Sequence, residues 1–251
     1  MKFTYESYKN LLDTLKIHGY QSAFYHNWQD FEKCAILRHD IDYEMEMAPY
    51  MANIEREKGV FSTYFVMVTS DFYNIFSIKN TETIKLVYNM GHEIGLHFDE
   101  TAYPDIMGNS EGIIKKINKE AKILEQVIEA PVTTVSMHKP SREILNANLE
   151  IPGMINSYEK VFFRDFKYVS DSRRNWKEPI ERYIENEEYS YLHILTHPFW
   201  YHNVEQTLHD TIHRFISNGN KQRYETFDFN FSRLDDVMKE NADYLIDSKG
   251  Q

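Results

Sequence analysis

The sequence predicts an α/β fold in which a parallel sheet is closed or half-closed into a barrel. Strand-like apolar runs alternate about six times with amphipathic helical segments, and this alternation is typical of parallel strands joined by helices. Several of the runs also end in His or Asp. Functional side chains gather at the carboxyl ends of parallel strands, so this second pattern indicates a site at one edge of the sheet.

Residues 34–42 carry the strongest of these signals. Four apolar residues lead directly into Arg-His-Asp-Ile-Asp, the pattern of a buried strand whose end carries ionisable groups. Alternate residues of a strand share a face, so Asp40 and Asp42 point the same way. A divalent cation or a shared proton would offset the repulsion between the two carboxylates. A solvated loop after the strand is the alternative.

The other elements follow from periodicity and from helix-capping residues. Further strands are predicted at residues 61–68, 91–98, 132–138, 168–171 and 191–198. Helices are predicted at about residues 4–18, 44–58, 81–90, 109–129 and 203–247. Neither a repeat nor a linker divides the chain, so we expect one domain over residues 1–251, with its barrel at about residues 34–200.

Charge and composition narrow the class of protein. The 39 acidic residues outnumber the 28 Lys and Arg residues, giving a net charge of −11, which disfavours nucleic acid as a partner. No window approaches about 18 consecutive apolar residues, and the first residues lack the apolar core of a signal peptide, so we expect a cytoplasmic protein without membrane insertion. The one cysteine, Cys34, can form no internal disulfide. The oligomeric state stays open.

The strand ends together predict a metal-dependent hydrolase. They carry Asp40, Asp42, His97, His138, Asp171 and His197. Oxygen and imidazole ligands, with a general base and a general acid, are the groups that such an enzyme needs. A single strand-end histidine is most often structural, whereas groups gathered from several strands favour a shared site. Nucleophile-elbow, phosphate-loop and paired-cysteine motifs do not occur.

These residues resemble the motifs of the polysaccharide deacetylase-like family with the NodB homology domain, carbohydrate esterase family four. The resemblance spans about residues 34–200, and the motif counterparts are residues 38–42, 91–97, 138–141, 171–176 and 195–197. It implies a distorted (β/α)7-type barrel that hydrolyses C–N bonds of amides. The divergent branch that resembles deacetylases of surface-polysaccharide biosynthesis fits best, so the implied substrate is an N-acetylated amino sugar or a polysaccharide precursor.

The resemblance also implies roles for individual residues. Asp40 would be the general base and Asp42 a metal ligand, although the reverse assignment stays open because both share a strand face. His97 would bind the metal, with His92 in support. His197 would be the general acid, held in its tautomer by Asp171 or Asn175. The implied substrate-binding residues are Trp176, Leu195 and Arg142, with Leu195 at the acyl pocket.

The chain departs from the family pattern at four positions. The family's second metal-binding histidine corresponds to Thr101, its third-motif arginine to His138, and its fourth-motif aspartate to Asn175. In the first motif an isoleucine, Ile41, separates the two aspartates. His138 is the natural substitute ligand, with Asp99 as a less favoured alternative. Two imidazoles and a carboxylate make Zn²⁺ the expected ion.

Two rival functions remain at this point. One is a hydrolase of the same fold acting on a non-sugar amide, such as a ureide or a cyclic imide. The other is a catalytically inactive protein that binds saccharides without a metal, which Thr101 and the missing third-motif arginine favour. A small molecule or an oligosaccharide is the expected partner in the main interpretation.

Overall fold

The structure, a computed structural model, describes residues 1–232, 234 and 238. The chain forms two compact units, Met1–Val204 and Glu205–Gln251. The first unit contains the sheet, and the second contains helix α8, Leu208–Asn230. The first of the C-terminal helices predicted over about residues 203–247 thus begins at Leu208, and the prediction for residues 233, 235–237 and 239–247 falls outside the described residues. The single domain over residues 1–251 stays a prediction.

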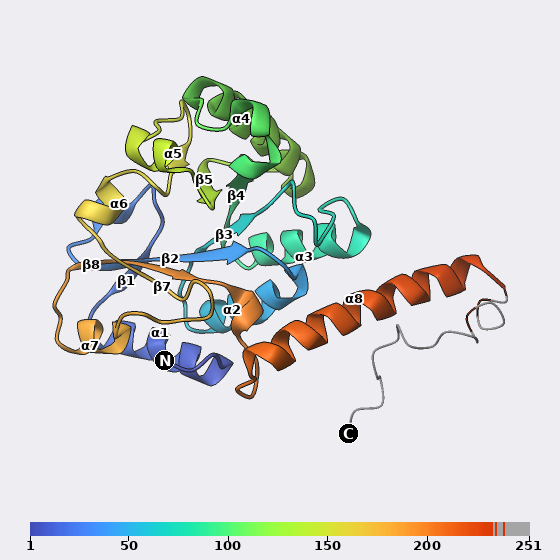
Figure 1. The fold of residues 1–251 in the computed structure, drawn as a ribbon. Coiled ribbons are helices and arrows are strands. Elements are labelled where there is room, and N and C mark those ends of the chain that lie inside the picture. The colour runs from blue at the N-terminus through green and yellow to red at the C-terminus, as the bar shows by residue number, and fades with distance from the viewer. Residues whose placement is uncertain (233, 235–237, 239–251) are drawn as a thin grey trace. The chain divides into compact units, whose positions relative to one another are not determined.

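The first unit is built around one sheet of eight strands. The strands are β1 (Gln21–Ala23), β2 (Cys34–Ile41), β3 (Thr63–Val66), β4 (Glu93–Asp99), β5 (Thr134–His138), β6 (Ile155–Asn156), β7 (Lys167–Ser170) and β8 (Tyr191–Thr196). Their order in space is β6-β5-β4-β3-β2-β8-β7, with β1 beside β2, and every pairing is parallel. No ladder between described residues joins β6 to β7. The sheet is therefore a curled half-barrel (Figure 1), and the predicted parallel fold is confirmed.

Strand β2 is the centre of this sheet. Its first half pairs with β1 and its second half with β3, while β8 runs along its other side. All eight of its residues are buried. Other parts of the chain cover both faces of a central parallel strand. Residues on both faces are therefore apolar, which gives the continuous apolar run from which the sequence predicted this strand. The ionisable residues at its end are consequently buried as well.

Seven helices accompany the sheet in the first unit: α1 (Tyr5–Ile17), α2 (Ala48–Glu57), α3 (Ile78–Asn89), α4 (Ser110–Ile128), α5 (Arg142–Ala147), α6 (Val161–Arg164) and α7 (Ile180–Glu185). The predicted start of α3 at residue 81 is wrong, because the Ser77 hydroxyl accepts from the Asn80 amide and begins the helix at Ile78. Strands β1 and β6 and helices α5 to α7 were not predicted, since they have at most six residues and periodicity needs longer segments.

Strands β3, β4 and β5 approach one another closely at Gly95. A Cβ atom at this position would lie 2.5 Å from the Phe65 ring and 3.0 Å from the carbonyl oxygen of Thr134. Only glycine fits there. This close packing holds β4 against its neighbours at a point two residues before His97.

Among the described residues, no helix combines the length and the apolar composition that crossing a membrane requires.

Candidate active site

Three ligand groups converge at the carboxyl ends of β2, β4 and β5: Asp42, His97 and His138. Asp42 Oδ1 lies 3.2 Å from His97 Nε2 and 3.4 Å from His138 Nδ1. The two imidazole nitrogens are 3.2 Å apart. Ligand atoms of a tetrahedral zinc ion, each about 2.0–2.1 Å from it, lie about 3.3 Å from one another, so this triangle has the size of a metal site.

Asp42 shows that the triangle also has the right chemistry. Its Oδ1 atom is buried and makes no hydrogen bond of normal geometry with the described residues. Burial alone would raise the pKa of Asp42, but the imidazoles of His138 and His97 hold it well below its usual value. An ionised, unsatisfied carboxylate oxygen that faces two imidazoles is an arrangement that a divalent cation satisfies. These three residues therefore fit a metal ion.

The two alternative positions lie outside this triangle. Asp99 Oδ1 accepts hydrogen bonds from the amide and hydroxyl of Thr101, at 2.8 and 2.7 Å. Asp99 thereby caps a short 3-10 helix, Glu100–Ala102, and Thr101 is exposed. His138, in the position of the family's arginine, is the group that completes the triangle.

Asp40 is held by an arginine that the sequence reasoning missed. Arg38 Nε donates to Asp40 Oδ1 at 2.8 Å, and Nη2 donates to Oδ2 at 2.7 Å and also to Ser136 Oγ. Arg38 is 0% and Asp40 4% exposed. Burial would raise the pKa of Asp40, but Arg38 and then His97 outweigh it and lower that pKa. The signal was present, because residues two apart on a strand share a face.

His197 and Asp171 form a second buried pair after β8 and β7. His197 Nδ1 lies 2.5 Å from Asp171 Oδ1, and the His197 amide donates to Oδ2 at 3.1 Å. Burial would lower the pKa of His197, but Asp171 raises it to about 9. Nε2 of the protonated ring lies 3.8 Å from Asp42 Oδ2 and so faces the metal triangle. Asn175 binds Asp171 only through its backbone amide, so Asp171 is the group that orients the imidazole.

A cavity of about 370 Å³ opens onto these groups. Asp40, Asp42, His97, His138, Leu195 and His197 all line it. The predicted site residues from four strand ends therefore share one cavity. Its aromatic walls are Tyr43, Tyr158, Tyr168 and Trp200, which the sequence reasoning did not single out. Aromatic residues are frequent throughout the chain, so composition gave no signal for these four.

Two predicted substrate-binding residues lie away from this cavity in the described structure. After Asp171 the backbone turns through two left-handed residues, Arg173 and Arg174, and Arg173 lines the cavity where Trp176 was expected. Ser141 caps helix α5, so Arg142 begins that helix with an exposed side chain, and the preceding Lys139 lines the cavity instead. The roles of Trp176 and Arg142 in substrate binding stay predictions.

A buried polar cluster around Glu55 lies behind the site. Glu55 is 0% exposed and accepts hydrogen bonds from the hydroxyls of Tyr8, Ser62 and Tyr64 at 2.5, 2.7 and 2.8 Å. His39 Nε2 lies 2.7 Å from the same carboxylate. His92, the predicted supporting histidine, belongs to this cluster and not to the metal triangle, since its Nδ1 lies 3.6 Å from Glu55 Oε2.

The fold and these groups define a parallel α/β half-barrel with a candidate metal-dependent hydrolytic centre at its carboxyl edge. No protein-family model matches the chain, and no curated protein matches it by sequence. Among solved structures, a carbohydrate esterase family four pseudoenzyme from Bacillus anthracis is 16% identical with a TM-score of 0.45, and the alignment covers 76% of this chain and 62% of that one. The chain therefore spans less than two thirds of that protein.

Two further solved structures belong to the family that the motifs resemble. A carbohydrate esterase family four esterase from Streptococcus mutans is 15% identical with a TM-score of 0.48, over 80% of this chain and 85% of that one. A polysaccharide deacetylase from Bacillus cereus is 16% identical with a TM-score of 0.45, over 76% and 88% of the two chains. Each is a protein to which this chain is similar in fold.

Proposed function

We propose that the protein is a metal-dependent hydrolase that removes an acyl group, in the first place acetyl, from the nitrogen of an amino sugar. One observation carries this proposal. The Asp42, His97 and His138 triangle shares one cavity with Asp40, whose pKa is lowered, and with His197, whose pKa is raised to about 9. An amide hydrolase needs this combination of electrophile, base and acid.

The proposed roles follow from the position of each group. A divalent ion held by the triangle, with Zn²⁺ as the proposed metal, would polarise the amide carbonyl and make water more acidic. Asp40 accepts the proton of the attacking water, because its carboxylate is ionised and lies beside the triangle, with Oδ2 3.6 Å from His97 Nε2. The charged Arg38 keeps both of its oxygens in place.

His197 is the proposed proton donor to the leaving group. Its Nδ1 atom is engaged by Asp171, so Nε2 is the nitrogen that can give a proton to the departing amine. Leu195, on the strand that leads to His197, lines the cavity and would contact the methyl group of an acetyl. A cytoplasmic location and a role in surface-polysaccharide biosynthesis stay predictions from the sequence.

The test measures metal and turnover together. Protein purified without chelator is analysed for bound metal and is then given an N-acetylated sugar carried on a nucleotide or on a lipid, with release of the free amine as the readout. We expect about one divalent ion per chain and amine release that Asp42→Asn abolishes. Metal-loaded protein that releases no amine from any N-acetylated sugar would exclude this function.

Saccharide binding without hydrolysis is the second candidate. The observation that favours it is the double contact of Arg38 with Asp40, because a carboxylate whose two oxygens both accept from arginine is a weak base. Calorimetric binding of an N-acetylated sugar by metal-free protein, with no turnover after a divalent ion is added, would support this candidate over the hydrolase.

A further inference from the structure

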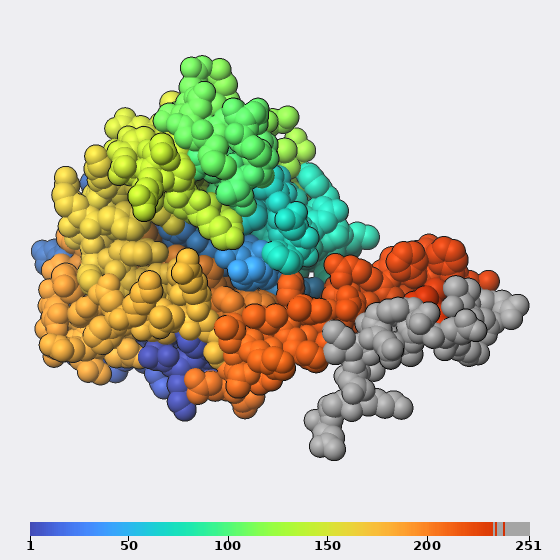
Figure 2. Space-filling model, in the orientation of Figure 1, coloured from blue at the N-terminus to red at the C-terminus, as the bar shows by residue number. Residues whose placement is uncertain are grey.

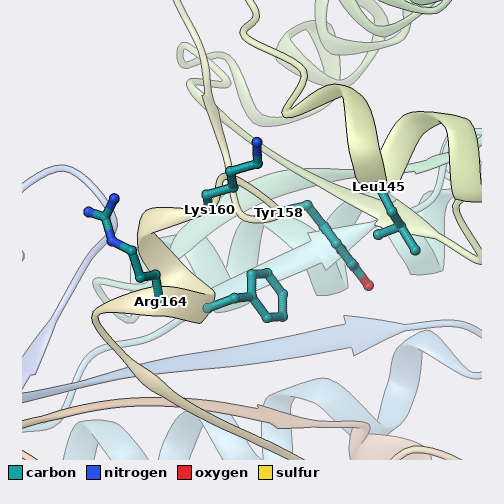
Figure 3. Close-up of a pocket in the computed structure, with 5 residues that line it drawn as sticks. Leu145, Tyr158, Lys160 and Arg164 are labelled. Atoms are coloured by element: carbon teal, nitrogen blue, oxygen red, sulfur yellow. The ribbon is translucent and has the colours of Figure 1, made fainter.

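A second cavity adjoins the candidate active site. Its volume is about 450 Å³, within the range of small-ligand sites. Leu145 of α5, Phe163 and Arg164 of α6, and Tyr158 and Lys160 of the segment before α6 line it. In Figure 3 the Tyr158 ring extends toward Leu145, while Lys160 and Arg164 lie on the side of Tyr158 that is opposite to Leu145. Figure 2 shows the yellow-green and yellow segments that carry α5 and α6 at the surface, next to each other.

Tyr158 connects this cavity with the site, because it lines both. The Arg38 guanidinium, which also holds Asp40, lies 5.0 Å from the centre of the Tyr158 ring. That cation–π contact supports the ring from the buried side. The Phe163 ring is 5.6 Å from Tyr158, centre to centre, at an angle of 34°. A molecule that extends from the first cavity past Tyr158 would therefore contact an aromatic surface formed by Tyr158 and Phe163.

The charge of this second cavity is opposite to that of the chain. The chain carries a net charge of −11, whereas the charged residues that line the cavity are Lys160 and Arg164 alone. Arg164 is already paired with Asp165, through contacts of 2.6 and 2.8 Å. Lys160 takes part in no ion pair with a described residue, so it is the cation left to bind an anion.

We propose that this second cavity is a subsite for an anionic part of the substrate, a phosphate or carboxylate group attached next to the amino sugar whose amide is cleaved. The aromatic rings pack against the carbon skeleton of that part, and Lys160 pairs with its charge. The subsite rests on the proposed function, since it extends the substrate beyond the reacting amide. It makes charged saccharides better ligands than neutral ones.

The test compares three compounds by calorimetry on the full-length, metal-loaded protein: N-acetylglucosamine, its 1-phosphate, and a disaccharide of glucuronic acid and N-acetylglucosamine. We expect at least one charged compound to bind about fivefold more tightly than the neutral sugar, the size of one solvent-facing charge-assisted contact. Lys160→Ala should remove this preference, and higher salt should weaken it. The phosphate and the carboxylate compounds identify the source of the anion.

Lys119→Ala is the matched control, because it removes another exposed lysine, from α4, that lines neither cavity. A preference that survives Lys160→Glu would show that Lys160 does not bind the anion and would overturn the subsite. Equal binding of charged and neutral compounds would overturn it as well. Lys160-dependent binding of the charged compounds without amine release from any of them would contradict the proposed function and leave the anion subsite supported.

Discussion

Arg38 and Asp40, two residues apart on β2, form a fully buried ion pair in which each carboxylate oxygen has its own guanidinium donor, at 2.8 and 2.7 Å. The pair lies within one strand, so its geometry depends on the strand and not on the docking of a distant segment. In the family pattern, an arginine of the third motif is expected at the position of His138. His138, which stands at that position here, is a candidate metal ligand instead.

Replacing Arg38 tests whether this pair supports both stability and catalysis. Arg38→Ala leaves the Asp40 charge buried without its partner, and we expect a loss of about 3–5 kcal/mol in the free energy of unfolding. Arg38→Lys keeps the charge but cannot form the double contact, so amine release should fall about tenfold or more while the bound metal is retained. Urea unfolding and steady-state kinetics measure the two effects.

The surface offers a matched control for this substitution. Arg164 makes the same double contact with Asp165, but its side chain is 73% exposed. Arg164→Ala should change the free energy of unfolding far less than Arg38→Ala does, because solvent screens the exposed pair. Similar losses for the two substitutions would contradict the role assigned to burial.

The metal site can be tested by removing its ligands one at a time. His97→Ala and His138→Ala should each lower the metal content measured by elemental analysis, because two remaining ligands bind a divalent ion much more weakly than three. Thr101→Ala is the control and should retain the metal, since Thr101 is exposed and binds Asp99. Metal loss in Thr101→Ala with retention in His138→Ala would refute the triangle.

The pH dependence of amine release follows from His197. An acid must be protonated to act, so the rate should be maintained at neutral pH and fall as the pH rises through about 9, where the raised pKa of His197 lies. The acid limb should lie below about pH 4, because Arg38 and His97 outweigh burial and hold the pKa of Asp40 below its usual value. A rate profile over this range provides the measurement.

Asp171→Asn identifies the group behind the alkaline limb. Asp171 makes the largest contribution that raises the pKa of His197, so its neutralisation should move the alkaline limb to lower pH by about one unit or more. Asn175→Ala should leave the limb in place, since only the backbone of Asn175 contacts Asp171. An alkaline limb that stays unchanged in Asp171→Asn would mean that His197 is not the acid.

Glu55 should be among the most important polar residues for stability. Its carboxylate accepts from three buried hydroxyls beside His39, so Glu55→Ala leaves several buried donors unsatisfied and should cost about 3–5 kcal/mol of the free energy of unfolding. Glu111→Ala, at an exposed i,i+4 pair with Lys115, is the control and should change the free energy of unfolding far less than Glu55→Ala does.

The same carboxylate makes stability depend on pH. Burial would raise the pKa of Glu55, but His39 and its other partners lower it to about 2. Because the pKa of Glu55 is lower in the folded than in the unfolded state, its ionised carboxylate stabilises the folded protein. This stabilisation is complete at a pH above the unfolded-state pKa of about 4.3, and it is lost as the pH falls toward 2. Unfolding measured at pH 7 and at pH 3 should therefore show a smaller effect of Glu55→Gln at the lower pH.

Local sequence patterns were sufficient for the elements and for the edge of the sheet that carries the site. The apolar run before Arg38 predicted β2, and the apolar stripe Ile113, Ile117, Leu124 and Ile128 predicted α4, all four of which are buried. That helix was predicted from about residue 109, and in the structure the side chain of Asn109 caps it by accepting from the Gly112 amide. Such features depend on residues that are close in sequence, whose spacing sets which face is apolar.

Only the tertiary structure decided which ionisable groups meet. Asp99 and His138 are register partners on β4 and β5, yet Asp99 turns to cap a helix while His138 faces His97. The contact between Arg38 and Tyr158, the place of Arg173 at the cavity and the second cavity itself depend on loops and on residues more than a hundred positions apart. The sequence determined the types and order of the groups. Their distances result from the register of neighbouring strands and from many weak contacts between distant segments, which no local pattern records.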